Sequence, residues 1–332
     1  MQVEYRRLPF RVRPLPDEPF DSWFEVMAHA YGVTVGEMGI ALGLVGEDKQ
    51  FRTTKWLAAQ WATDLTTSQA QRLEATTGLP AAEFHAMTRA RFWRGGMRKA
   101  RTGGISAASP AAGLGGRFCP DCLQDSGGRW RMSWGIPMGF ACLRHSRLLA
   151  DVCPICKLPP RRAGHPLTLV PVPGACHNRA PGATGYKQRC RAGLATNDRR
   201  LEASAPVRGA QRIIFRILSS GRAAFGIYAD LPQPSIHVLE DLRLLARLAR
   251  HAARDRPTVM MSELDDAVVI EFLSRASLND SERSRPEGAV NIAVGATLAV
   301  HALGDRERLI QALRGRLATS TSYVAHTPQM QE

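Results

Sequence analysis

The sequence Cys-Pro-Asp-Cys at residues 119–122 is followed by Cys-Leu-Arg-His at 142–145, and Cys-Pro-Ile-Cys at 153–156 is followed by a cysteine at 176. Shifting the first three cysteines by 34 positions gives the next three, so the pattern is a tandem repeat. A Cys-x-x-Cys turn directs two thiolates to one side, and a second pair of ligands completes the tetrahedron that zinc accepts. The repeat therefore predicts two zinc modules in tandem.

The two modules differ in how completely the sequence defines their ligands. The first contains Cys119, Cys122, Cys142 and His145, a closed set of the structural rather than the catalytic type. The second has two candidates for its fourth ligand, Cys190 and His177. Neighbouring Cys176 and His177 rarely fit one tetrahedron without strain, so we predict the set Cys153, Cys156, Cys176 and Cys190. Spacing alone also permits cross-bracing, in which alternate pairs share a metal.

Disulfides and ordinary buried thiols are the alternatives to zinc. Thiols buried by chance are not expected to form two Cys-Pro-x-Cys pairs. Disulfides require an oxidising compartment, whereas residues 1–13 contain four arginines and no apolar stretch of a signal peptide. We therefore expect a cytoplasmic, nucleoid-associated protein that binds two zinc ions.

Composition and charge indicate a globular protein with a polyanionic partner. The chain has 332 residues, 44% of them hydrophobic, and its longest mostly apolar segment, 290–303, is too short to span a membrane. The net charge of +14 is concentrated in two windows without acidic residues, 84–120 and 152–197. This concentration predicts DNA binding, and a solvated basic surface is the alternative.

Helices are expected before the first zinc module. Four prolines in residues 8–19 predict an extended arm. Asp21 or Ser22 is expected to cap a helix that ends at Gly32, and two further helices are expected over 34–42 and around Trp56 and Trp61. Residues 67–88 have the outline of a helix-turn-helix, although its second helix offers few side chains that could contact a base.

A basic cluster follows this hairpin and is predicted to contact phosphates. It consists of Arg89, Arg91, Arg94, Arg98, Lys99 and Arg101, interleaved with Phe92 and Trp93. The alternative is that the two aromatic side chains pack on the helices and the cations are merely solvated. Residues 102–116 have the composition of a flexible linker.

The expected fold class is mainly α, with tandem zinc modules in the centre. Trp130 and Trp134 are expected to pack on the first zinc module. Helices are predicted over 206–219, 235–253, 262–276, 286–303 and 305–318. In the second of these, leucines 239, 242, 245 and 248 are expected to be buried, with arginines 243, 247, 250 and 254 on another face. The expected domains are 1–103, 104–195 and 196–320, followed by a disordered tail, 321–332.

The chain resembles the TniQ family, the target-selection proteins of bacterial transposons. The resemblance rests on the arm from Leu8 to Glu18 with Ser22-Trp23, on Arg129-Trp130-x-x-Ser133-Trp134, on Leu148-Leu149, and on the cysteine motifs up to Cys156. Lys157 departs from the family, in which a glycine commonly follows the second Cys-Pro-x-Cys.

The resemblance implies a non-enzymatic adaptor that binds target DNA and recruits an AAA+ ATPase, a TnsC-like transposition regulator. Some family members sit on an RNA-guided CRISPR effector complex, which is a further candidate partner, as is a second copy of the chain in a homodimer. The alternative function is a zinc-finger transcription regulator. An enzyme is disfavoured because the chain has no Gly-Lys dipeptide, no Gly-x-Ser-x-Gly and no His-x-Glu.

Overall fold

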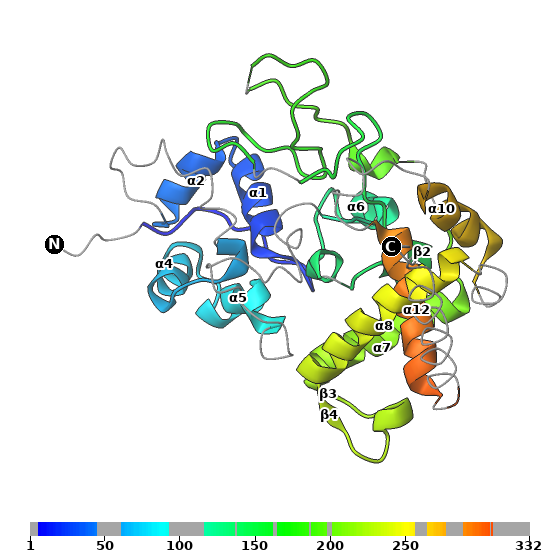
Figure 1. The fold of residues 1–332 in the computed structure, drawn as a ribbon. Coiled ribbons are helices and arrows are strands. Elements are labelled where there is room, and N and C mark those ends of the chain that lie inside the picture. The colour runs from blue at the N-terminus through cyan, green and yellow to red at the C-terminus, as the bar shows by residue number, and fades with distance from the viewer. Residues whose placement is uncertain are drawn as a thin grey trace, which may run out of the picture. The chain divides into compact units, whose positions relative to one another are not determined.

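The computed structural model of the protein describes residues 6–44, 61–92, 116–136, 138–161, 165–185, 187–197, 201–255, 264–276, 288–305 and 307. These residues are mainly helical, which confirms the predicted fold class (Figure 1). The chain divides into two compact units, Met1–Glu202 and Ala203–Glu332. The first unit contains both the N-terminal helices and the cysteine region. The predicted domain boundaries at 103/104 and 195/196 stay predictions. The predicted linker, helix 305–318 and tail lie almost entirely outside the described residues.

In the N-terminal part of the first unit, the structure describes four complete α-helices and a 3₁₀ turn. They are α1 (Phe20–Ala30), α2 (Val35–Ala41), α4 (Thr67–Thr77), α5 (Ala81–Ala86) and η2 (Arg89–Phe92). Capping boxes start two of them, Thr34 with Glu37 for α2 and Thr66 with Gln69 for α4. Of the helix predicted around Trp56 and Trp61, only the part from residue 61 onward is described, and residues 61–63 are helical.

The predicted start of α1 is wrong. The helix begins at Phe20, with Pro19 as the N-cap residue, so Asp21 and Ser22 lie inside its first turn. Ser22 cannot cap the helix because its hydroxyl donates to Glu18 and accepts from the backbone N–H of Trp130. Its side chain therefore connects α1 to the first cysteine module.

An aromatic cluster forms the core of these helices. Trp23 of α1 lies 5.3 Å, between ring centroids, from Phe84 of α5, and Phe24 lies 5.5 Å from Trp61. Leu73 of α4 is fully buried in the same core. Leu73 and Phe84 thus lie on the inner side of the hairpin α4–α5, and Gly78 turns the chain between the two helices with a φ of +69°.

The proline-rich arm is non-helical and is held against these helices along its length. The N–H of Leu8 donates to the carbonyl of Thr76 at 2.8 Å, and Arg11 donates to the carbonyl of Gly78 at 2.9 Å. Further along, the indole N–H of Trp23 donates to the carbonyl of Val12 at 2.7 Å. The arm therefore lies over the turn of the hairpin.

The cysteine region contains little regular structure. Its elements are α6 (Pro120–Asp125), η3 (Met132–Gly135), the antiparallel strands β1 (Ala141–Cys142) and β2 (Arg147–Leu148), and η4 (Leu194–Thr196). Phe118 pairs with Ala150 beside the hairpin, and the N–H of Leu148 donates to the carbonyl of Leu201 at 2.9 Å. The chain therefore leaves this small sheet after Ala150 and returns to it at Leu201.

The described part of the second unit contains four α-helices, a 3₁₀ turn and a small hairpin. They are α7 (Ala205–Ser220), β3 (Arg222–Ala223), η5 (Gly226–Tyr228), β4 (Gln233–Pro234), α8 (Ser235–Asp255), α10 (Asp266–Ala276) and α12 (Ala289–Gly304). α12 is almost entirely apolar and packs against α7, α8 and α10, so it is the core of this unit (Figure 1).

The predicted buried face of α8 is only partly right. Leu242 is fully buried, but Leu239, Leu245 and Leu248 are half-buried, and the other buried apolar residues are Val238, Ala246 and Ala253. Small alanines allow α12 to approach closely at these positions. The interface is therefore rotated from the leucine face towards the alanines.

Candidate metal centres

The structure brings the four predicted ligands of the first module together. Cys119 and Cys122 lie at the start of α6, Cys142 ends β1, and His145 lies in the turn between β1 and β2. Their ligand atoms all lie within 4.8 Å of one another. The helix turn and the tight hairpin thus each contribute one pair of ligands.

The distances within this cluster fit a tetrahedral zinc ion. Zn–S and Zn–N bonds of about 2.3 and 2.1 Å give tetrahedral edges of about 3.8 Å between two sulfurs and about 3.6 Å between sulfur and nitrogen. The Sγ atoms of Cys122 and Cys142 are 3.6 Å apart, and Nδ1 of His145 lies 3.2–3.7 Å from the three sulfurs. The donor set and its spacing therefore suit zinc, with Nδ1 as the ligand atom of His145.

A carboxylate orients the histidine from outside the cluster. Nε2 of His145 lies 3.2 Å from a carboxylate oxygen of Asp125, which also pairs with Arg144 at 2.9 Å. Metal-ligating histidines commonly donate their second ring N–H to such a group, which fixes the tautomer. The cluster thus has the outer partner expected of a metal site.

The second cluster consists of Cys153, Cys156, Cys176 and Cys190, whose ligand atoms likewise lie within 4.8 Å of one another. The Sγ–Sγ distances of 3.7 Å for Cys153–Cys190 and for Cys156–Cys176 match the same tetrahedral edge. Each cluster draws on one module alone, so the geometry does not follow the cross-braced alternative.

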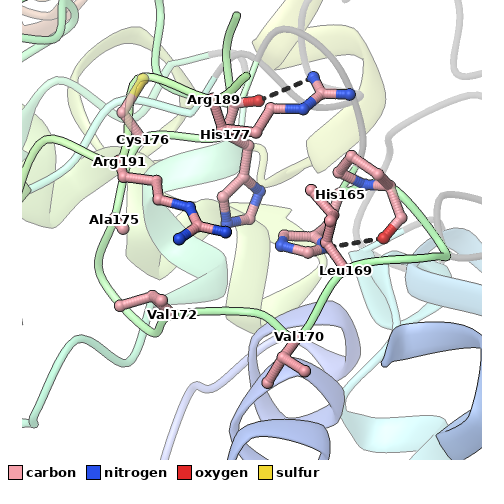
Figure 2. A pocket seen from close by; sticks show the side chains of 10 residues that line it. His165, Leu169, Val170, Val172, Ala175, Cys176, His177, Arg189 and Arg191 are labelled. Carbon is pink, nitrogen blue, oxygen red and sulfur yellow. Dashed lines mark hydrogen bonds between the residues drawn. The ribbon is translucent and has the colours of Figure 1, made fainter. Parts of the chain in front are cut away.

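His177, the other candidate for the fourth position, lies outside the second cluster. Figure 2 shows the sulfur of Cys176 and the ring of His177 pointing in different directions, with the His177 ring beside His165. The two histidine rings are 4.7 Å apart between centroids, and Nε2 of His177 lies 3.7 Å from Glu25. Burial lowers the pKa of His177 to about 3, so the ring is neutral.

The backbone around the second cluster explains how one pair of its ligands is presented. Lys157, directly after Cys156, has a φ of +58°, a left-handed conformation that favours glycine. This turn allows the N–H of Lys157 to bond to the carbonyl of Cys153 at 3.1 Å. The side-chain amide of Asn178 donates to the sulfur of Cys156 at 3.4 Å. Lys157 therefore has a backbone conformation that glycine would adopt more easily.

The crowding of thiols affects their protonation. Hydrogen bonding to Cys122 raises the pKa of Cys119, and burial raises the pKa of Cys176. Without a cation, thiols in such positions keep their protons, whereas a metal binds the thiolate. Metal binding at either cluster must therefore release protons.

A buried ion-pair network joins the second module to α1. Arg161 is 5% exposed; its guanidinium donates to Glu25 and lies 3.2 Å from Asp21. The same guanidinium lies over the ring of Trp130, 4.8 Å from the centroid. In the sequence, Arg161 is one of several cations of the basic window 152–197, and no local pattern predicts this role.

A second network joins the first module to the start of α1. Arg129 donates to both carboxylate oxygens of the buried Glu18, and the carboxylate of Asp17 accepts from the hydroxyl of Ser133 at 2.6 Å. Trp130 packs between Phe118 and Trp134, both within 6 Å between ring centroids. The two tryptophans are thus core residues of the first unit.

The two modules touch through glycines. Gly128 and Gly174 both have positive φ, and a Cβ atom placed on Gly128 would lie 2.5 Å from the carbonyl carbon of Pro173. A Cβ atom on Gly174 would lie 2.7 Å from Cα of Gly128. Only glycine permits this approach of the two backbones.

The predicted phosphate-binding cluster is described only in its first part. Arg89 is buried, 9% exposed, and burial lowers its pKa, so its guanidinium is not presented at the surface. Arg91 pairs with Asp17 at 2.6 Å and lies over the Phe92 ring. The remaining members, Arg94, Arg98, Lys99 and Arg101, lie outside the described residues.

The first unit thus combines a helical core with two closed four-ligand clusters. Its candidate metal centres are therefore of the structural type. Residues 9–149 match the family model TniQ, which confirms the resemblance seen in the sequence. This segment is therefore similar to the TniQ family. A search of curated proteins finds no match. Among the described helices, none is both long and apolar enough to cross a bilayer.

Proposed function

We propose that this protein is a transposition target-selection adaptor that binds target DNA, alone or through an RNA-guided complex, and recruits an AAA+ ATPase. The observation that carries the proposal is the TniQ match over residues 9–149. Two zinc ions, held by the two clusters, stabilise the first unit in this proposal.

The closed metal sites favour an adaptor over a hydrolase. Four protein ligands fill a tetrahedron and leave no position for a water nucleophile. The cluster residues are buried or half-buried, and their neighbours Arg129 and Arg161 are committed to internal ion pairs. The protein must then act through its surfaces. We propose that the arm and the N-terminal helices contact the ATPase.

DNA contact is proposed for the surface cations that follow α5. Base readout by the hairpin α4–α5 has little support, because the exposed side chains of α5 are Ala82, Glu83 and Ala86. Arg7 and Arg11 also lie over its turn at Gly78. We therefore propose phosphate contact by Arg91, Arg94, Arg98, Lys99 and Arg101, and omit the buried Arg89.

The test is capture of a cognate AAA+ ATPase, with and without target DNA, together with nuclease and strand-transfer assays. ATPase capture without cleavage or joining is the expected result. Robust cleavage by the isolated protein would contradict the adaptor function. Sequence-specific DNA binding without ATPase capture would support a transcription regulator instead.

A further inference from the structure

Helix α7 of the second unit carries a face of arginines that the proposed function does not use. Arg208, Arg212 and Arg216 follow one another at intervals of four residues, so they lie on one side of the helix. The opposite side is buried in the unit, through Val207, Ala210, Ile214, Ile217 and Leu218. We call these three residues the α7 arginine face.

The charged residues in the sequence around α7 are of one sign. No aspartate or glutamate occurs between Glu202 and Asp230, a stretch that contains four arginines. Arg212 and Arg216 are exposed, and within the part of the chain that the structure describes neither has an acidic partner. Arg208 is half-buried and donates to the carbonyl of Ala203, so it supports the face from its end.

Two arginines of α8, unlike those of α7, contact neighbouring helices. The side chain of Arg250 lies against Gly295 of α12, and the guanidinium of Arg254 lies over the Phe272 ring, 5.5 Å from its centroid. Exposed Leu244 and the acidic Glu240 and Asp241 share the surface of α8. Of these two helices, α7 is therefore the one that contains arginines and no acidic residue.

We propose that the α7 arginine face binds the phosphate backbone of duplex DNA, independently of sequence. The face extends about 12 Å along the helix, over which a duplex presents about seven phosphates. Arginine is well suited to phosphate because its planar guanidinium forms two parallel hydrogen bonds. The inference rests on the DNA-binding part of the proposed function and adds a contact in the second unit.

The composition of the face favours nucleic acid over an acidic protein partner. The exposed residues of α7 are Ala205, Arg212, Arg216, Ser219 and Ser220, and none has a large apolar side chain. Protein interfaces have an apolar centre, whereas protein–DNA interfaces are polar and strongly positive. A partner that neutralises charge without needing an apolar contact therefore fits best.

The experiment measures binding of the full chain to a short duplex of arbitrary sequence over about 50–200 mM salt. Arg212→Ala with Arg216→Ala is expected to reduce the slope of log affinity against log salt by about 1.8, since each phosphate contact contributes about 0.9. Arg212→Lys with Arg216→Lys should retain most of the slope. Arg243→Ala with Arg247→Ala removes the same charge from exposed positions of α8 and should leave the slope unchanged.

Three results would overturn the inference. One is an unchanged slope for the α7 pair; another is an equal reduction for the α8 pair, which would indicate a net-charge effect. The third is no duplex binding by the wild-type chain at low salt. Because the ATPase is absent from this assay, its capture remains a separate measurement, and failure of recruitment would not affect the result for α7.

Discussion

Arg161 in the second cysteine module and Glu25 in α1, separated by 136 positions in sequence, form a buried ion pair that Asp21 extends. The pair therefore connects the second cysteine module directly to α1, the helix that contributes Trp23 and Phe24 to the aromatic core. Metal at the second cluster, which organises the chain around Arg161, is therefore expected to stabilise the N-terminal helices as well.

The first prediction concerns this pair. Arg161→Met should destabilise the first unit by about 3–5 kcal/mol, because it leaves two buried carboxylates without their cation. Urea unfolding followed by tryptophan fluorescence measures this, since all six tryptophans lie between residues 23 and 134. Arg179→Met, at an exposed position of the same module, is the control. Equal stability of the two variants would refute the structural role of Arg161.

The second prediction is that each chain binds two zinc ions. Elemental analysis should give two for the wild type, one for Cys190→Ser and two for His177→Ala, because His177 points away from the second cluster. His177→Ala should still lower stability, since the ring is buried. A single zinc in the His177 variant would show that the fourth ligand is misassigned.

The third prediction concerns the outer partner of His145. Asp125→Asn should weaken zinc binding at the first cluster about 10–100-fold, because the carboxylate no longer holds the imidazole in its binding tautomer. Competition against a chromophoric chelator measures the affinity. Arg144→Ala removes the surface partner of the same carboxylate and should change the affinity little. An Asp125 variant with wild-type affinity would exclude the orienting role.

The fourth prediction separates conformational strain from steric contact at two adjacent glycines. Gly127 and Gly128 both have positive φ, but only at Gly128 does an added Cβ atom meet the backbone of the other module. Alanine at either position should cost about 1–2 kcal/mol for the left-handed conformation. Gly128→Ala should cost clearly more, as measured by the same fluorescence assay. If both variants lose the same stability, the modules are not in contact there.

The fifth prediction tests phosphate contact by the basic cluster. Replacing Arg94, Arg98 and Lys99 by alanine should reduce the salt slope of DNA binding by up to about 2.7, at about 0.9 per contact. Alanine at the exposed Lys157, Arg179 and Lys187 removes the same charge from the second module. We expect this control variant to keep the wild-type salt slope of DNA binding. A slope that falls only in the control variant would place the phosphate contacts on the second module instead.

The ligand sets were predictable because spacing restricts which side chains can reach one metal. Two Cys-x-x-Cys turns and a local Cys-x-x-His specify the clusters almost without tertiary information. Helix existence was predictable for a similar reason, since caps such as Thr34 and Thr66 are local signals.

Long-range relationships were not predictable from a single sequence. Arg161 has no local feature that distinguishes it from the solvated arginines around it; only the fold brings it to Asp21 and Glu25. α8 contains leucines on several sides, so the pattern does not say which side α12 covers. Arg89 was assigned to DNA on charge alone, and burial places it elsewhere.

After the second module the chain returns to β2, so both ends of this module lie at the same small sheet. Residues 151–200 leave the small sheet beside Ala150 and rejoin it at Leu201, so they form a loop whose two ends meet on a fixed base. The TniQ match ends at residue 149, just before this loop departs. Lengthening a loop with anchored ends costs only about 0.6 kcal/mol per doubling. The second module is thus anchored at both ends on the small sheet, and the contacts of Arg161 and Gly174 hold it to the rest of the first unit.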